Sequence, residues 1–287
     1  MKVAITGAGG MLGQALQGAF RLHDLTCWRH SQLDIEDAEA VQSDVRAGGF
    51  DWLLNAAAYT AVNQAERERE QAFAANAEGC RNLAVACNAA GCRLLSVSTD
   101  YVFDGEAGRA YREDDTPNPI NVYGESKWAG EELIRQYCPR HLIVRTSWLY
   151  GAGGKHFVDT MLALAQRKPQ IDVVADQRGS PTWTEDLAHM ILRLVEEGCL
   201  GTYHVTNSGH CSRYEMVREI VACKGLETTV TAVTTEEFER KYPPGEGRQR
   251  VDRPPYSVLD NAGLRRLGWE PLRSWKKALR AYLGEKT

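Results

Sequence analysis

The stretch KVAITGAGGMLGQALQGAF, residues 2–20, decides the fold. Residues 2–6 form a short apolar run typical of a buried strand, and a helical pattern begins at Met11. Glycines at positions 7, 10 and 13 lie at the junction between them. Such a loop lets a pyrophosphate approach the N-terminus of the helix. The stretch therefore predicts a dinucleotide-binding α/β domain, and a tight turn without a ligand is the alternative.

The first half of the chain continues this alternation of strands and helices. Further strand-like runs lie at 25–28, 51–58, 93–99 and 141–148, and helical patterns lie at 35–48, 64–90 and 122–137. Strands that alternate with helices pair in parallel through right-handed crossovers. We therefore expect a Rossmann-type, doubly wound parallel sheet.

The pattern changes after residue 150, which predicts a second part of the chain. Helical patterns at 157–168 and 184–198 are followed by a loop-rich stretch that contains several prolines. We expect residues 1–150 to form an NAD(P)-binding Rossmann domain and residues 151–287 to form a smaller substrate-binding domain. Helix 184–198 is expected to pack on the first domain.

The composition is typical of a globular protein and excludes several classes of function. The chain has 287 residues, 43% of them hydrophobic and 25% charged, and a net charge of −4. This charge gives no general attraction to nucleic acid or to an anionic membrane. The eight cysteines include no Cys-x-x-Cys pair, and no signal peptide or membrane-spanning run is visible. A cytoplasmic protein is expected.

The stretch CWRHSQ, residues 27–32, indicates the type of cofactor. NAD-binding domains usually carry an acid about 20 residues after the first glycines, where it binds the ribose hydroxyls. Here Arg29 and His30 stand in that region, and Asp34 is the nearest acid. A guanidinium suits the 2′-phosphate of NADPH. NADPH is therefore favoured over NADH, Asp34 is placed near the adenine or ribose, and a solvated basic turn is the alternative.

The pattern Tyr-x-x-x-Lys occurs twice, as Tyr123 with Lys127 and as Tyr282 with Lys286. The first pair follows a polar loop and opens a helix that should face the strand ends. The second pair flanks Gly284 near the end of the sequence, where a frayed terminus and a chance match are expected. The spacing is the same in both pairs, so only their sequence context can indicate which pair is functional.

Several motifs occur in a characteristic order along the whole chain. They are the glycine loop, NAAAYTAV (55–62), STDYVFDG (98–105), NVYGESKWAGE (121–131), RTSWLYG (145–151), DQRGSPTW (176–183) and RPPYSVLD (253–260). In this order they resemble the extended short-chain dehydrogenase/reductase family, and within it the dTDP-4-dehydrorhamnose reductases. The resemblance implies reduction of the C4 ketone of dTDP-4-dehydro-6-deoxy-L-mannose, a dTDP-4-dehydro sugar, to dTDP-L-rhamnose.

The resemblance also implies a catalytic set of Thr99, Tyr123 and Lys127. Reduction of a ketone needs a proton on the oxygen, and Tyr123 is expected to donate it. A phenol has a pKa near 10, so its anion needs stabilisation, which the Lys127 ammonium one helical turn away can supply. The resemblance further implies that Lys127 reaches the nicotinamide ribose and that Thr99 donates a hydrogen bond to the substrate carbonyl.

The remaining site residues follow from the glycine loop, from the stretch after the second strand and from the same resemblance. Expected at the cofactor, besides Tyr123 and Lys127, are Gly7, Gly10, Met11, Leu12, Gly13, Arg29, Asp34, Ala56, Ala57 and Ala58. Expected at the substrate are Thr60, Val62, Tyr101, Trp148 and Arg253, the last at the nucleotide diphosphate. The alternatives are a core position for Tyr101 and Trp148 and a solvated loop arginine for Arg253.

The resemblance leaves other functions and partners open. One alternative is a nucleotide-sugar epimerase or dehydratase that keeps its cofactor bound. Another is a non-catalytic subunit like the regulatory subunit of methionine adenosyltransferase. Some relatives are described with Mg²⁺ that joins two subunits through glutamates, but Ala15 stands at one matching position, so no metal ligand is expected. A homodimer is a further expectation, and neither nucleic acid nor membrane is an expected partner.

Overall fold

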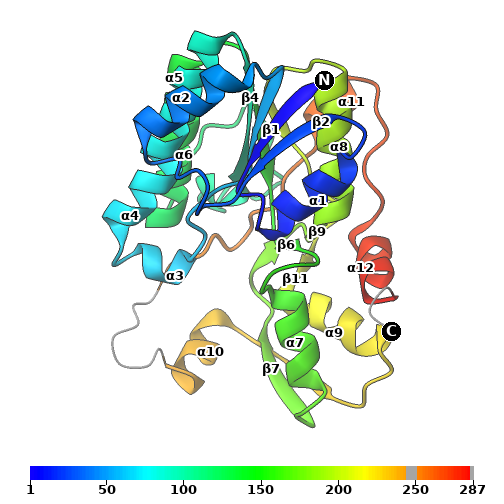
Figure 1. Ribbon diagram of the computed structural model, residues 1–287. Helices are drawn as coiled ribbons and strands as arrows, with labels where there is room; N and C mark the ends of the chain where they lie inside the picture. The colour runs from blue at the N-terminus through cyan, green and yellow to red at the C-terminus, as the bar shows by residue number, and fades with distance from the viewer. Residues whose placement is uncertain (244–250, 285–287) are drawn as a thin grey trace.

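A six-stranded parallel sheet forms the centre of the computed structural model, which describes residues 1–243 and 251–284 (Figure 1). The strand order is β10-β5-β4-β3-β1-β2. The strands are β1 (Lys2–Thr6), β2 (Asp24–Trp28), β3 (Trp52–Asn55), β4 (Arg93–Thr99), β5 (His141–Thr146) and β10 (Gly201–His204). The chain leaves β1 toward β2 on one side and returns to β3 on the other. In sheets of this kind, ligands bind outside the carboxyl ends of the strands at this reversal.

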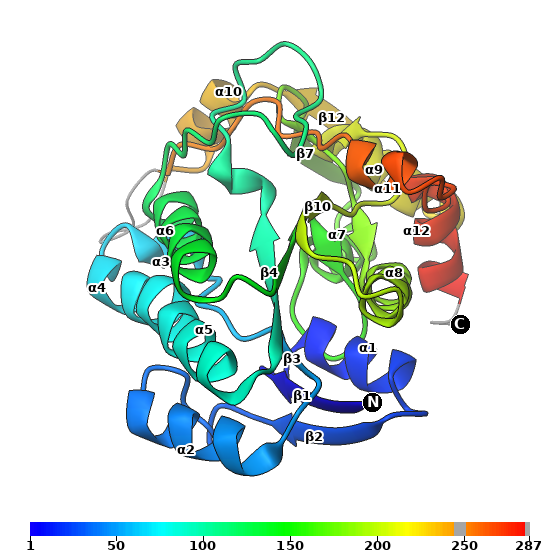
Figure 2. The same cartoon turned by 90° about the horizontal axis from the view of Figure 1, so that it is seen from above.

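Helices cover both faces of the sheet. Figure 2 shows α2 (Ala38–Gly48), α5 (Gly79–Ala90) and α6 (Val122–Tyr137) on one face, and α1 (Met11–Ala19) and α8 (Thr184–Glu196) on the other. Each face buries its own apolar cluster between helices and sheet. The doubly wound parallel sheet predicted from the sequence is confirmed.

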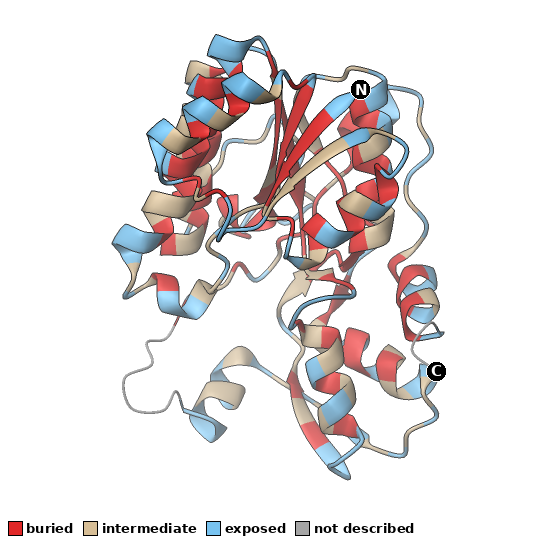
Figure 3. Cartoon of the chain, viewed as in Figure 1, coloured by how far each residue is buried: buried red, intermediate tan, exposed pale blue. Residues whose placement is uncertain are grey.

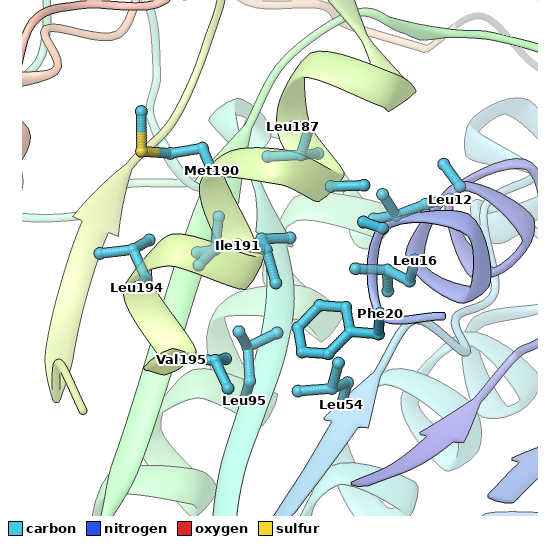
Figure 4. Close-up of a cluster of buried hydrophobic side chains, with 14 of the residues drawn as sticks. Leu12, Leu16, Phe20, Leu54, Leu95, Leu187, Met190, Ile191, Leu194 and Val195 are labelled. Carbon is cyan, nitrogen blue, oxygen red and sulfur yellow. The ribbon is translucent and has the colours of Figure 1, made fainter. Parts of the chain in front are cut away.

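Two elements from beyond residue 150 belong to this layered structure. In Figure 4, Leu12 and Leu16 of α1 lie near Leu187 and Ile191 of α8, in one buried cluster. Strand β10 pairs in parallel with β5, with Gly201 opposite Leu142. The sequence did not indicate that residues 201–204 join the main sheet, because periodicity does not tell which sheet a short strand enters.

A smaller part lies beyond the carboxyl ends of the strands (Figure 1). It contains the parallel pair β7 (Gln170–Val174) and β12 (Thr229–Val233), the helices α7 (Phe157–Ala165), α9 (Arg213–Cys223), α10 (Thr235–Lys241) and α12 (Trp275–Gly284), and the short strands β6 (Leu149–Tyr150), β8 (Arg178–Gly179), β9 (Thr182–Trp183) and β11 (Cys211–Ser212). A third buried apolar cluster joins α7, α9 and α12. Helix α11 (Ala262–Arg266) lies beside β10.

Tyr282 lies in this third cluster, contrary to the frayed terminus expected from the sequence. Its ring is only 2% exposed, and its hydroxyl donates a hydrogen bond to the Asp159 carboxylate at 3.0 Å. The expectation is wrong because the apolar face of α12 packs into the core. Lys286, the other half of the second pair, lies outside the described residues.

The helix predicted at 64–90 consists of several pieces. They are α3 (Val62–Ala65), α4 (Arg69–Phe73), a π-helical turn (Ala74–Glu78) and α5. The turn at residues 66–68 interrupts the helix. The π turn holds Asn76, whose buried amide accepts from the Tyr59 N–H at 2.9 Å and donates to the Ser126 hydroxyl of α6 at 3.0 Å. A π turn often marks a functional site, and here it ties the segment after β3 to α6.

Burial follows the layers. Figure 3 shows the central strands buried, while the outer faces of the covering helices are exposed. Within residues 1–243 and 251–284, the helices all fall short of the length and apolarity needed to cross a membrane.

Candidate active site

The glycine loop between β1 and α1 depends on two close backbone approaches. Gly7 has a φ of +68°, and a Cβ atom there would lie 2.5 Å from the Ala57 nitrogen. A Cβ at Gly13 would lie 2.2 Å from the Gly7 carbonyl oxygen. Gly10 caps α1 without any side-chain hydrogen bond. The first N–H groups of α1 therefore face the carboxyl edge without a side-chain cap, as an anion-binding helix N-terminus requires.

The end of β3 lies against this loop. The Asn55 carbonyl oxygen (Oδ1) accepts hydrogen bonds from the Thr6 hydroxyl at 2.8 Å and from the Ala57 N–H at 3.1 Å. Ala56 and Ala57 add little side-chain bulk beside Gly7, and Ala58 follows them. The structure thus brings the predicted glycines and alanines together at the chain reversal. Leu12 differs from them, because its side chain points into the core (Figure 4) and only its backbone faces the loop.

Arg29 and Asp34 follow the end of β2. The Arg29 side chain is near the glycine loop, since a Cβ at Gly9 would lie 3.6 Å from its Cγ. The Asp34 carboxylate accepts the Glu36 N–H at 3.0 Å and lies 3.8 Å from His30. Arg29 is therefore a cation beside the loop, whereas Asp34 stabilises the turn that leads to α2.

Thr99 and Tyr123 meet at the carboxyl edge of the sheet. Thr99 ends β4, and Tyr123 is the second residue of α6, whose N-cap Asn121 accepts the Gly124 N–H at 2.8 Å. A Cβ at Gly124 would lie 2.2 Å from the Tyr101 carbonyl oxygen, so glycine lets this helix start close to Tyr101. Burial raises the pKa of Tyr123 well above its usual range, while the hydrogen bond with the Thr99 side chain acts to lower it. Tyr123 is thus a half-buried, protonated phenol.

Lys127 lies one helical turn beyond Tyr123 and is only 4% exposed. Its ammonium donates to the Val97 carbonyl of β4 at 2.8 Å. Burial lowers the pKa of Lys127, and the Coulombic influence of Cys80 and Glu131 acts in the opposite direction. The Ser126 hydroxyl donates to the Tyr123 carbonyl at 2.8 Å and links this turn to Asn76. Hydrogen bonds to β4 and to Asn76 therefore hold the start of α6 in place.

Tyr101, a predicted substrate residue, lies near both Tyr123 and Arg253. Its ring packs edge-on against Tyr123, with 5.8 Å between centroids. Arg253 donates to the side chain of Asn63 at 2.7 Å, and Asn63 follows Val62 at the start of α3. Burial raises the pKa of Tyr101, and the Arg253 charge lowers it. Arg253 therefore lies near both Asn63 and Tyr101.

Trp148 connects the two parts of the chain through its contact with Arg213, a residue that the sequence did not indicate. Among the described residues, Trp148 alone combines a side chain with a positive φ, +47°. The Arg213 guanidinium of α9 lies 3.4 Å from the centre of its ring and 4.7 Å from that of Phe157. Strain of this kind often marks a functional site. No sequence signal identifies Arg213, because its contacts are distant in the chain.

Asp100 is a second residue that the sequence analysis missed, although it lies within the quoted motif STDYVFDG. It is 2% exposed, and its carboxylate accepts from the Thr99 and Ser147 hydroxyls at 3.0 Å each. Burial raises the pKa of Asp100, and hydrogen bonds from Ser257, Ser147 and Thr99 offset part of this effect. An acid beside Thr99 at a strand end was an available signal.

The described residues show no donor set for a metal. Over residues 1–243 and 251–284, no group of three or more His, Cys, Asp or Glu side chains could hold an ion. The residues present therefore do not fit a bound Mg²⁺ within one described chain. They do fit a dinucleotide, because glycine is required where the loop approaches β3 and the first turn of α1 lacks a side-chain cap.

Known proteins resemble this chain over its full length. The RmlD substrate binding domain family matches residues 1–287. The spore coat polysaccharide biosynthesis protein SpsK of Bacillus subtilis is 42% identical over 100% of this chain and 98% of its own length. A dTDP-4-dehydrorhamnose reductase of Streptomyces griseus is 42% identical over 96% of this chain and 90% of its own.

A solved structure gives the same result in three dimensions. The dTDP-4-dehydrorhamnose reductase of Bacillus anthracis, crystallised in complex with NADP, matches with a TM-score of 0.93 and 41% identity. The match covers 99% of this chain and 100% of the crystallised one. The fold, the glycine loop and these full-length matches agree, and the chain belongs to the RmlD substrate binding domain family.

Proposed function

We propose that this protein is an NADPH-dependent reductase that converts the C4 ketone of dTDP-4-dehydrorhamnose into the alcohol of dTDP-L-rhamnose. The observation that carries the proposal is the half-buried Tyr123 phenol, near Thr99 and one turn from Lys127, at the sheet edge that holds the glycine loop. The names of the relatives and the NADP of the crystallised one support it.

The proton transfer follows from the environment of Tyr123. When bound, NADPH supplies a hydride to C4. Tyr123 gives its hydroxyl proton to the ketone oxygen, so that carbon gains the hydride, oxygen gains the proton and an alcohol results. Burial keeps Tyr123 protonated beforehand, because it raises the pKa of the phenol. The Lys127 ammonium offsets the phenolate charge that proton transfer leaves behind.

The other predicted residues take binding roles in this proposal. Gly7, Gly10 and Gly13, with the backbone of Met11 and Leu12, hold the pyrophosphate, and Ala56, Ala57 and Ala58 leave room for the cofactor. Arg29 binds the 2′-phosphate, and Asp34 orders the turn beside it. Thr60, Val62, Tyr101 and Trp148 surround the sugar, and Arg253 binds the diphosphate. Arg253 also lines a pocket of about 270 Å³ that Gln177 and Thr235 border.

We further propose a division of labour between the two parts of the chain. Residues 1–150 bind the cofactor, and helix α8 and strand β10 complete their layers. The remainder of 151–287 binds the sugar nucleotide, because Trp148 and Tyr101 meet Arg213 of α9 at the boundary. The homodimer and the cytoplasmic location stay predictions.

The test is turnover of dTDP-4-dehydrorhamnose with NADPH, followed by cofactor absorbance. The wild type is expected to consume one NADPH per sugar reduced. Tyr123→Phe should lower kcat by about 10²–10⁴-fold and leave NADPH binding unchanged, because only the transferable proton is lost. Tyr137→Phe, at the far end of the same helix, is the matched control and should change kcat by less than about twofold. Absence of turnover by the wild type with either cofactor would refute the proposal.

The same assay separates the alternative functions. An epimerase or dehydratase regenerates its cofactor, so it would convert sugar without net loss of NADPH. A regulatory subunit would show no turnover and would co-purify with a larger enzyme. A panel of dTDP- and UDP-linked 4-keto sugars then identifies the preferred substrate.

A further inference from the structure

Asn121 uses both ends of its side-chain amide, and each end bonds to a different segment of the chain. Its Oδ1 atom accepts the Gly124 N–H at 2.8 Å, which caps the N-terminus of α6. Its Nδ2 atom donates to the Asp252 carbonyl at 2.9 Å, 131 residues away in the sequence. Asn121 is only 4% exposed. The reverse orientation of the amide would set an N–H against the Gly124 N–H, so these two bonds fix which atom faces which segment.

The bond to Asp252 bears directly on Arg253. The Asp252 carbonyl belongs to the peptide group that joins these two residues, and a peptide group is planar. A donor that holds its oxygen therefore also holds the nitrogen and the Cα atom of Arg253. At the far end of the side chain, the Arg253 guanidinium donates to the Asn63 Oδ1 atom at 2.7 Å. A guanidinium has five N–H donors, so several remain for a ligand.

Three hydrogen bonds close a ring at this corner of the site. Asn121 links α6 to residues 251–258, which we call the C-terminal strap. Arg253 links the strap to α3. The Glu66 carboxylate, directly after α3, accepts the Val122 N–H of α6 at 2.9 Å. Side chains therefore place the strap relative to the start of α6, although the two segments are far apart in the sequence.

The strap has further anchors beyond Arg253. Gly105 has a φ of +88°, and a Cβ atom there would lie 2.7 Å from the Cδ atom of Pro255, so the loop after β4 packs closely on the strap. The Pro255 carbonyl accepts the Arg178 N–H of β8 at 2.8 Å. These contacts follow Arg253 in the chain, whereas the bond from Asn121 lies directly ahead of it. The backbone of Arg253 is therefore held on both sides.

We propose that Asn121 is a positioning residue for the substrate, which acts through the Asp252 peptide and holds Arg253 where the diphosphate of the sugar nucleotide binds. The inference rests on the proposed function, in which Arg253 binds this diphosphate. The same side chain begins the helix that bears Tyr123. One residue thus sets the distance between the anchor of the nucleotide and the proton donor, and proton transfer depends on such positioning.

Two substitutions separate the bond to the strap from the cap of the helix. Serine and aspartate are both good N-cap residues, so Asn121→Ser and Asn121→Asp keep the start of α6 but remove the donor to Asp252. With dTDP-4-dehydrorhamnose and NADPH, each should raise KM about 3–10-fold, as expected for one hydrogen bond, and change kcat less than about twofold. A purely structural role in α6 would instead lower kcat and the affinity for NADPH, because Tyr123 and Lys127 lie on this helix.

A double-mutant cycle tests whether Arg253 is the intermediary. Arg253→Ala alone should raise KM about 10–100-fold. In that background Asn121→Ser should add less than about twofold, since the guanidinium that Asn121 places is gone. Asp37→Ser, at the N-cap of α2, is the control for a changed cap and should leave KM unchanged in both backgrounds. An unchanged KM in both Asn121 variants, or an equal loss in the two backgrounds, would overturn the proposal.

A second measurement needs no turnover. Titration calorimetry with dTDP, which keeps the diphosphate but lacks the sugar, should show binding that is about 3–10-fold weaker in Asn121→Ser, and the effect should vanish in Arg253→Ala. The affinity for NADPH should stay within about twofold. Equal results for the wild type and Asn121→Ser, absence of binding included, refute the positioning role even where turnover is found. The expected difference in a protein without turnover would refute only the reductase function.

Discussion

The Arg145 guanidinium of β5 and the Glu131 carboxylate of α6 form a buried ion pair, with 2.7 Å between Nη2 and Oε2 and at most 2% exposure on either side. Glu131 lies one turn beyond Lys127, so the pair holds α6 to the sheet. Arg135 also donates to Glu131 at 2.7 Å, and the His204 ring lies 3.4 Å from Arg145. Removal of one partner from such a network leaves a buried charge without compensation.

Glu131→Gln is expected to lower the free energy of unfolding by about 3–5 kcal/mol, because Arg145 loses its counter-charge. Urea denaturation measures this loss. Glu132→Gln, on the same helix, removes a half-exposed partner of Arg135 and should cost less than about 1 kcal/mol. Similar losses in the two variants would show that the buried pair is not special.

His204 makes stability depend on pH. Burial, together with the nearby Arg145 charge, lowers the pKa of His204 from 6.5 to about 3. The unfolded chain therefore binds a proton below pH 6.5 that the folded chain refuses, so stability falls as the pH drops from 6.5 toward 3. Between pH 7 and 5 this single group should account for about 2 kcal/mol.

His204→Gln tests this dependence through urea denaturation at both pH values. The variant should lose about 2 kcal/mol less than the wild type between pH 7 and 5. His189→Gln, at an exposed position of α8, is the control and should keep the wild-type slope. Glu131 acts in a lower window, since Arg145 and Arg135 outweigh its burial and hold its pKa below the usual value.

Gly7→Ala should destabilise the protein by at least about 1–2 kcal/mol and weaken cofactor binding, because the new Cβ would need a left-handed backbone and would strike Ala57. Thermal unfolding and NADPH titration measure both effects. Gly18→Ala, on α1 where nothing lies within 4 Å of the added atom, should be neutral or stabilising by up to about 1 kcal/mol.

Arg29→Ala should weaken NADPH about 10–100-fold, as expected for the loss of a charge-assisted phosphate contact. NADH lacks the 2′-phosphate, so its affinity should change by less than about twofold. Titration calorimetry with both cofactors distinguishes this role from a solvated basic turn, in which neither affinity would change. Arg46→Ala, an exposed arginine of α2, is the matched control.

Local sequence patterns correctly predicted the parallel sheet and the helices that cover it. The strand-and-helix alternation and the loop at Gly7 depend on neighbours in the chain, so the sequence showed them directly. The prediction of one helix at 64–90 was wrong at residues 66–68, where a turn separates α3 from α4. The π segment that holds Asn76 follows α4. The buried position of Tyr282 was missed because a helix near the chain end can still pack into a core.

The sequence by itself determined the doubly wound sheet, the loop at its first junction, and Thr99, Tyr123 and Lys127 as the group to consider, because spacing and order carry that information. Only the tertiary structure decided that Tyr101 meets Arg253, that Trp148 lies under Arg213, and that Asp100 gathers Thr99 and Ser147. These contacts join distant segments of the chain. Asp100 and Ser147, for example, are 47 residues apart in the sequence. Burial and the direction of a hydroxyl proton are properties of the packed chain, and no local pattern records them.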